Sequence, residues 1–390
     1  MYRKNIWIWS LLAVLALGCG GKQESTVKDQ EIPDQVHRVV GYVAGYRDFD
    51  FTKIQAEKLT HINYAFANVI DGKVMFDTAN IDNTSLKDDD LKALQRLKEG
   101  NPDLKILVSV GGWTWSGNFS DAALTKESRV KFAKSAAGFV SKYRLDGIDI
   151  DWEYPNQIGA GNIHRVEDVE NFTLLMKEVR AELDQLSNSN NQKHFLLTIA
   201  TGADSAYVSN TKLGEVAKYL DFINIMTYDF YNGLHHTTGH HANLYASTMN
   251  KLRISDVVHS VELHEQAGVP LNKLTVGIPF YGRRWEGVTV NDKHGLYQKA
   301  ESVGQIVFYW QIAKECLNNS KYKRYWDEAA KAPYLWNESE QIFISYEDEE
   351  SIGHKIKYLK EKGLSGVMFW EYSDDYEAKL LDAIHDNLNN

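Results

Sequence analysis

The stretch DGIDIDWEYP, residues 146–155, decides how the rest of the chain is interpreted. Asp149, Asp151 and Glu153 are each two residues apart, so in a β-strand all three side chains point to one face. The Ile and Trp residues between them point to the other face, which suits packing against helices. The alternative is an edge strand with a solvated acidic face, but the Gly and Ile residues between the acids are typical of a buried strand.

A buried row of acids indicates proton chemistry. Burying unpaired carboxylates is costly, and like charges raise the pKa of at least one of them, so that one carboxyl stays protonated near neutral pH. A protonated acid beside an ionised one is the arrangement that protonates a leaving group.

Seven further apolar segments of strand length alternate along the chain with segments of helical periodicity. This alternation predicts an α/β fold, a parallel (β/α)₈ barrel. More chain separates the last two strands than one helix needs, and residues 284–344 are predicted to form an α+β subdomain inserted between strands 7 and 8. The seven further strands are expected at 38–46, 61–69, 104–111, 195–201, 222–228, 274–280 and 366–371.

The net charge and the N-terminal sequence limit which binding partners and which cellular location are expected. The 390 residues carry a formal charge of −10, which argues against nucleic acid, because phosphate contacts need Lys and Arg. Residues 1–18 form a basic start and an apolar run too short to span a bilayer. Cys19 follows directly, which resembles a bacterial lipoprotein signal, with residues 19–35 as a flexible tether. We expect an exported monomer that contacts the membrane only through lipid on Cys19; ordinary secretion is the alternative.

In such barrels the site lies at the C-terminal ends of the strands, and the unusual residues of this sequence fall there. Acids follow one strand, and glycines or large aromatic side chains follow several others. Pyranose rings have apolar faces that stack on Trp and Tyr, while their hydroxyls need polar partners. A pocket with aromatic walls and acids therefore predicts a sugar substrate.

The acids at residues 146–153 resemble the D-x-x-D-x-D-x-E motif of the family 18 glycoside hydrolases, the chitinase family. The resemblance extends over residues 36–390 and includes the subgroup that carries a chitinase insertion domain. Further matching motifs are SVGGW at 109–113, MTYD at 226–229, FYGR at 280–283 and FWEYSDD at 369–375.

The resemblance implies a chitinase that cleaves β-1,4 bonds between N-acetylglucosamine units with retention and without a cofactor. Glu153 would be the general acid, and Asp151 would orient the substrate's own 2-acetamido nucleophile. Asp149 would share a proton with Asp151, and Tyr228 would bind the acetamido oxygen. Asp146 and Ser109 would support these groups from behind. The implied sugar contacts are Trp113, Gly112, Tyr154, Met226, Asp229, Tyr281, Arg283, Trp370, Tyr64 and Phe66.

Two other functions stay open within the same scaffold, a chitin-binding lectin without catalysis and an endo-β-N-acetylglucosaminidase acting on N-glycans. The presence of Glu153 argues against the lectin, and the insertion at 284–344 argues against the second. Four histidines between residues 235 and 241 raise the question of a metal site. Their spacing lacks the acid or Cys partners of ordered metal sites, so no metal is expected.

Overall fold

The computed structural model describes residues 37–76, 87–250 and 256–390. The expected leader at residues 1–18, Cys19 and the whole expected tether, residues 19–35, lie outside the described residues. None of the helices in the described part is long and apolar enough to cross a membrane.

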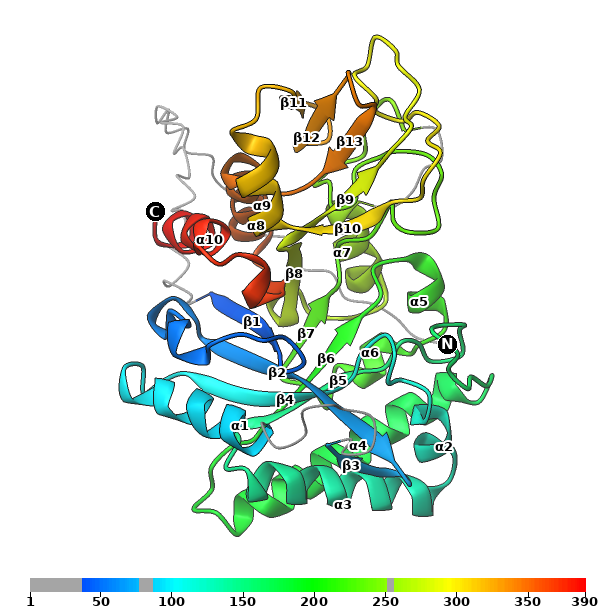
Figure 1. Ribbon diagram of the computed structural model, residues 1–390. Helices are drawn as coiled ribbons and strands as arrows, with labels where there is room; N and C mark the ends of the chain where they lie inside the picture. The colour runs from blue at the N-terminus through cyan, green and yellow to red at the C-terminus, as the bar shows by residue number, and fades with distance from the viewer. Residues whose placement is uncertain (1–36, 77–86, 251–255) are drawn as a thin grey trace, which may run out of the picture. The chain divides into compact units, whose positions relative to one another are not determined.

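Eight parallel strands close into a barrel, which confirms the predicted fold (Figure 1). The sheet runs β1-β14-β8-β7-β6-β5-β4-β2 and is closed by the pairing of β1 with β2. A short strand that the sequence did not predict, β3 (Lys73–Met75), pairs antiparallel with β2. The barrel strands are β1 (Arg38–Ala44), β2 (His61–Ile70), β4 (Lys105–Gly111), β5 (Gly147–Asp151), β6 (Leu196–Thr201), β7 (Phe222–Ile225), β8 (Leu274–Pro279) and β14 (Gly366–Trp370).

Helices follow most of the strands and cover the outside of the barrel (Figure 1). Their ends are set by local signals: α9 begins after Asp348, which forms a capping box with Ser351, and ends at Gly363 with φ of 72°. The C-terminal helix α10 was not predicted. The helices are α1 (Lys87–Arg96), α2 (Phe119–Leu124), α3 (Lys126–Lys142), α4 (Asp168–Asn188), α5 (Ser205–Ser209), α6 (Leu213–Val216), α7 (Val257–Gln266), α8 (Tyr309–Ile312), α9 (Glu349–Lys362) and α10 (Lys379–Asn389).

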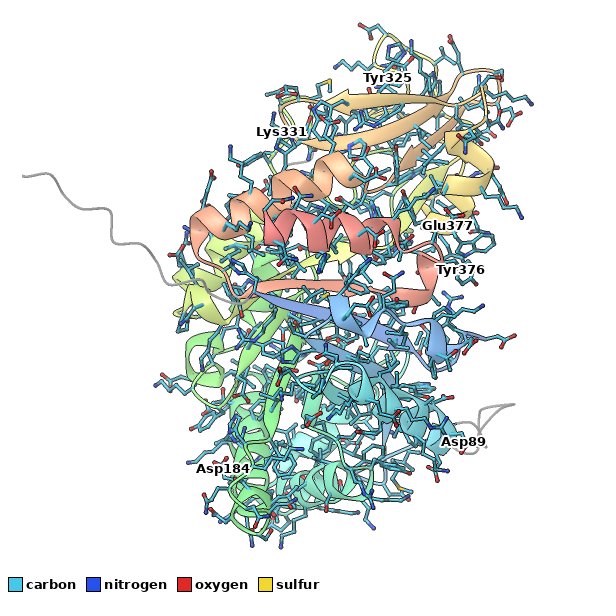
Figure 2. The ribbon with its side chains drawn as sticks, turned by 90° about the vertical axis from the view of Figure 1, so that its left-hand side faces the viewer. Asp89, Asp184, Tyr325, Lys331, Tyr376 and Glu377 are labelled. Atoms are coloured by element: carbon cyan, nitrogen blue, oxygen red, sulfur yellow. The ribbon has the colours of Figure 1, made fainter. Side chains whose placement is uncertain are left out.

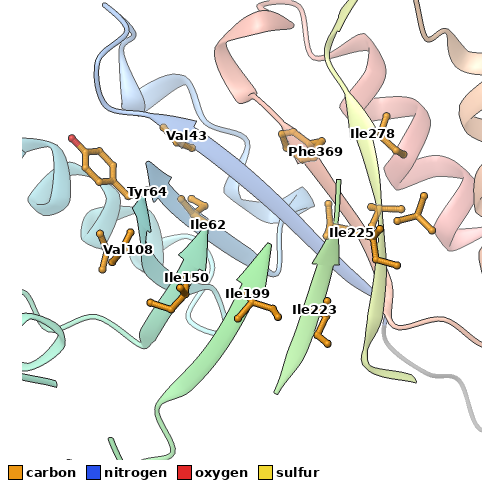
Figure 3. Close-up of a cluster of buried hydrophobic side chains, with 14 of the residues drawn as sticks. Val43, Ile62, Tyr64, Val108, Ile150, Ile199, Ile223, Ile225, Ile278 and Phe369 are labelled. Carbon is orange, nitrogen blue, oxygen red and sulfur yellow. The ribbon is translucent and has the colours of Figure 1, made fainter. Parts of the chain in front are cut away.

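The main hydrophobic core lies between the strands and this layer of helices. Alternate residues of each strand point outward into it, as Figure 3 shows for Ile62, Val108, Ile150 and Ile199. The opposite residues of the same strands point into the barrel. Because the outward face supplies the burial energy, the inward face is free to carry polar groups.

The chain between β8 and β14 forms a separate five-stranded antiparallel sheet in the order β10-β9-β13-β12-β11 (yellow to orange in Figure 1). It has a small aromatic core of its own around Trp285 and Phe343. The sheet begins at Tyr281, three residues before the predicted boundary, so Tyr281 and Arg283 belong to the insertion. Its strands are β9 (Tyr281–Trp285), β10 (Gln305–Phe308), β11 (Lys323–Asp327), β12 (Ala332–Asn337) and β13 (Ile342–Ser345).

Asp146 ties β5 to β4 at the end of the barrel away from the strand C-termini. It accepts the Ile106 N–H at 2.8 Å and pairs with Lys193 at 2.9 Å and with Lys98. Burial favours a higher pKa, but these partners outweigh it and lower the pKa of the carboxyl.

We expect Asp146→Ala to lower the free energy of unfolding by about 2 kcal/mol, because a buried N–H loses its acceptor. Asp146→Asn keeps a hydrogen-bond acceptor and should lower the free energy of unfolding by less. Since the folded-state pKa is depressed, the wild-type contribution is present above about pH 4 and is lost as the pH falls through the folded-state value. Urea unfolding at pH 7 and pH 3 measures both effects. If the free energy of unfolding differed between wild type and variant by the same amount at both pH values, this account would be contradicted.

Candidate active site

The innermost acid of the row, Asp149, is fully buried inside the barrel and saturated with hydrogen bonds. Burial raises its pKa, while the donors work in the opposite direction by stabilising the charge. Its neighbours on other strands therefore hold the carboxylate in one fixed orientation. The donors are Tyr42 at 2.8 Å, Ser109 at 2.7 Å, Thr198 at 2.5 Å and Asn224 at 3.5 Å.

Asp151 lies between the other two acids of the row. Its side chain is buried, and burial together with the charges of Glu153 and Asp149 raises its pKa well above the usual range. Within the described part of the chain, its Oδ1 atom has no hydrogen-bond partner. A buried polar atom without a partner is costly, so this oxygen is available to a ligand's donor.

Glu153 follows the end of β5, and its backbone is fixed by Ser116. The Ser116 hydroxyl accepts the Glu153 N–H at 2.8 Å and donates to the Asp151 carbonyl at 3.1 Å. Burial raises the pKa of Glu153 to about 7, with a smaller rise from Asp229, while a hydrogen bond with Tyr154 lowers it. A carboxyl with this pKa keeps its proton for a substantial fraction of the time at neutral pH, as a general acid requires.

Asp229 is the ionised counterpart of Glu153. Arg283 holds it in a fork, with Nε and Nη2 each 2.7 Å from a carboxylate oxygen. Burial acts to raise its pKa, but His241 and Arg283 outweigh burial and lower it. The preceding residue, Tyr228, is half-buried beside these acids. Desolvation and the charges of the acids raise its pKa well above 10, so it stays a neutral hydrogen-bond donor. The carboxyls of Glu153 and Asp229, in one site, are thus kept in different protonation states.

Aromatic side chains form the floor and one rim of the site. Trp370, at the end of β14, stacks on Phe66 with ring centroids 5.4 Å apart. Trp113 is 52% exposed and meets Tyr154 edge-on at 6.3 Å. Because β5 and β14 stand opposite each other in the closed barrel, Glu153 and Trp370 approach the site from opposite sides.

These groups line one cavity of about 1270 Å³, open to solvent. Exposed aromatic faces and buried acids in one cavity fit a saccharide better than a small apolar ligand. The predicted site residues that line it are Phe66, Trp113, Asp151, Glu153, Tyr154, Met226, Tyr228, Asp229, Tyr281, Arg283 and Trp370.

The family model "Glycosyl hydrolases family 18" matches residues 38–375. The chain belongs to this family. It is 37% identical to Chitinase A1 of Niallia circulans over 90% of this chain and 58% of that protein, so it spans little more than half of that relative.

Two solved structures are similar over about nine tenths of this chain. One is an N-acetylglucosaminidase of glycoside hydrolase family 18 from Paenibacillus barengoltzii, at 43% identity and a TM-score of 0.82, covering 90% of this chain and 99% of that one. The other is chitinase ChiA74 from Bacillus thuringiensis, at 33% identity and a TM-score of 0.84, covering 91% and 70%.

One of the predicted sugar contacts in this family 18 chain, Tyr64, is wrong. Tyr64 is buried in the core outside the barrel, where its hydroxyl donates to Asp90 at 2.5 Å. The pairing of β2 with β4 shifts register between Ala65 and Ala67, so Tyr64 and Phe66 do not share a face as strict alternation would require.

Gly112 is not among the residues that line the cavity, and its sugar contact stays a prediction. Its φ is +81°, and a Cβ there would lie 2.6 Å from the ring of Phe66. Only a glycine at this position leaves room for the close approach of that ring. Asp146 also lies away from the cavity and stabilises the opposite end of β5, whereas Ser109 contacts Asp149 directly as predicted.

Sequence reasoning missed three residues that hold the buried acid Asp149: Tyr42, Thr198 and Asn224. The available signal was a polar or hydroxyl side chain at an inward position of an otherwise apolar strand. The alternation of side chains along a strand marks such inward positions. It does not show that side chains from three separate strands contact the same carboxylate.

The histidine-rich segment after β7 is mostly structural. His241 lies 3.8 Å from Asp229, and burial lowers its pKa to about 4, so it is neutral at pH 7. His240 is 3.2 Å from Asp327 of the insertion. Across the described ranges, no group of three His, Cys, Asp or Glu side chains is placed to hold a metal ion.

Proposed function

We propose that the protein hydrolyses β-1,4 bonds between N-acetylglucosamine units by retaining, substrate-assisted catalysis, as a chitinase. The observation that carries the proposal is the buried row Asp149, Asp151 and Glu153, in which Asp151 keeps one oxygen without a protein partner. The family membership and the similarity to chitinases support the substrate class.

In the proposed first step, the sugar on Trp370 presents its 2-acetamido group to Asp151, which accepts the amide N–H. The acetamido oxygen attacks the anomeric carbon while Glu153 gives its proton to the departing glycosidic oxygen. Tyr228 donates a hydrogen bond to the acetamido group. Asp151, whose proton passes to Asp149 when the sugar binds, is then negatively charged and stabilises the positive charge that develops on the acetamido group.

In the second step, the Glu153 carboxylate takes a proton from water as that water attacks the anomeric carbon. The acetamido oxygen leaves, and two inversions give net retention. No enzyme carboxylate bonds to the sugar, which is why the 2-acetamido group is an absolute requirement in this mechanism.

Product analysis by mass spectrometry on chitohexaose and its fully de-N-acetylated form tests the proposal. We expect cleavage of the first and no cleavage of the second, because only the first carries the nucleophile. Cleavage of both would mean that the enzyme supplies its own nucleophile. Binding of chitohexaose without cleavage would favour the lectin, and release of single sugar units would separate exo from endo action.

We also propose that the protein is exported and anchored to the bacterial envelope through lipid on Cys19. The apolar run before Cys19 and the polar stretch after it support the proposal. Cys19→Ala should move the protein from the membrane fraction to the soluble fraction, as followed by immunoblotting. Cys316→Ala is the matched control and should leave the distribution unchanged; a membrane-bound Cys19→Ala variant would contradict lipid anchoring.

A further inference from the structure

His241 is a fully buried histidine whose ring faces the active-site acid Asp229. Its Nδ1 atom lies 3.8 Å from Asp229 Oδ1, just beyond hydrogen-bond distance. In the described part of the chain, neither ring nitrogen of His241 has a hydrogen-bond partner. A buried polar group without a partner is costly, so this ring needs an explanation beyond packing.

Two hydrogen bonds of the His241 backbone fix the ring beside Asp229. The N–H of Phe230, the residue after Asp229, donates to the His241 carbonyl at 3.1 Å, so the loop between them closes on itself. The His241 N–H donates to Ser345 Oγ at 3.0 Å. Ser345 lies on β13, in the sheet that carries Tyr325 near the top of Figure 2. The ring is therefore held by the barrel loop and by the insertion together.

The charges around His241 keep the ring neutral. Burial lowers its pKa to about 4; Arg283 and Lys355 act in the same direction, and Asp229 opposes them. Lys355 is itself buried and pairs with Glu347 at 2.6 Å. A neutral imidazole carries one N–H donor and no charge. The titratable groups that face the ring are Asp229 after β7, Tyr281 and Arg283 on β9, and Lys355 on α9.

Arg283 alone does not fix the Asp229 carboxylate relative to the barrel. Its fork binds both carboxylate oxygens, but a long side chain and its partner can move together. A donor from the buried ring of His241 would give Oδ1 a second, rigid contact. The position of Asp229 matters, because its charge adds to burial in raising the pKa of Glu153. Hydrogen bonds in active sites are often long without substrate and tighten in the complex.

We propose that His241 is a positioning residue, which in the substrate complex donates its Nδ1–H to Asp229 Oδ1 and holds that carboxylate in place beside the reacting sugar. This inference rests on the proposed function. His241 is not among the residues that line the cavity, so it acts on the reaction only through Asp229.

The kinetic test compares His241→Leu with His241→Asn on chitohexaose. Leucine fills the space of the ring without a donor, and we expect kcat to fall roughly 10-fold, the lower end of the range for a hydrogen bond to a charged group. The side-chain amide of asparagine can place an N–H where Nδ1–H was. His241→Asn should therefore recover kcat to within about threefold of wild type.

His264→Leu is the matched control. His264 is equally buried, bonds Thr201 Oγ1 at 2.9 Å through Nε2 and is not among the residues that line the cavity. Its loss should leave kcat within about threefold of wild type, since no reacting group is contacted. An equal fall in kcat in His264→Leu and His241→Leu would overturn the proposal, and so would a His241→Asn variant as slow as His241→Leu.

NMR of the histidine ring tests the contact itself and does not depend on the leucine variant being folded. The sample is ¹⁵N-imidazole-labelled Glu153→Gln protein with and without chitohexaose, and the His241 signal is the one absent after a further His241→Asn change. We expect a proton on Nδ1 that moves downfield when the sugar binds, because a bond to a carboxylate deshields it. A proton on Nε2 in the complex, or a signal that does not move, would overturn the proposal.

Failure of this inference is distinguishable from failure of the proposed function. If wild type does not cleave chitohexaose, the proposed function fails and the role of His241 in the reaction falls with it. If wild type cleaves chitohexaose and His241→Leu keeps the wild-type kcat, only the role of His241 is overturned.

Discussion

Glu153→Gln is expected to lower kcat by about 10³-fold while the affinity for chitohexaose stays within about threefold of wild type. The amide has the size and shape of the carboxylic acid but cannot give a proton to the leaving oxygen, a contribution of roughly 10²- to 10⁴-fold in enzymes. Initial rates on chitohexaose and calorimetric binding measure the two quantities separately.

The pH profile of Glu153 gives a second, independent expectation. Its pKa is raised to about 7, so kcat/KM of wild type should fall as the pH rises through about 7 and the acid loses its proton. A carboxyl with a raised folded-state pKa also contributes stability that is complete below its unfolded value and lost as the pH rises through the folded value. The melting temperature of Glu153→Gln at pH 8 should therefore equal or exceed that of wild type.

Glu338→Gln serves as the control, since Glu338 is an exposed glutamate in the turn between β12 and β13. It should change neither rate nor pH profile. A Glu153→Gln variant that keeps more than about a tenth of the wild-type kcat would remove Glu153 from the role of general acid.

The alternation of residues 148–153 predicted which acids share a face, because the period of two is fixed by strand geometry. The same rule failed between Tyr64 and Phe66. Tyr64 follows Ile62 on the outward face, and the register shift between Ala65 and Ala67 turns Phe66 toward the cavity instead. Nothing in the sequence HINYAFANV distinguishes a shifted strand from a regular one. Local geometry was therefore predictable where the strand is regular and unpredictable where the pairing is not.

The electrostatic partners of the acids were harder to predict, because they are set by closure of the barrel. Tyr42 reaches Asp149 from 107 residues away, and Arg283 reaches Asp229 from 54 residues away. Such pairs depend on which strand ends meet across the mouth of the barrel. A single sequence shows that an Arg follows one strand and an Asp another, but it does not show that they form a fork.

Asp151→Asn is expected to lower kcat on chitohexaose by roughly 10²- to 10³-fold, the size of effect seen when one electrostatic contact to a reacting group is removed. The Oδ1 atom of Asp151 has no protein partner in the described chain, so the substrate's amide N–H is the donor it would accept. An asparagine side chain keeps one oxygen but loses the negative charge that stabilises the charged acetamido intermediate. The loss should therefore fall on kcat more than on KM.

Asp204→Asn is the matched control for this variant. Asp204 lines the same cavity but stands outside the acidic row and caps helix α5 by accepting the Tyr207 N–H at 2.8 Å, a role that asparagine can fill. We expect its kcat to stay within about threefold of wild type, the range of a surface change without a reacting partner. If Asp151→Asn behaves like Asp204→Asn, the charge of Asp151 does not act on the acetamido group, and the nucleophile must be sought elsewhere in the cavity.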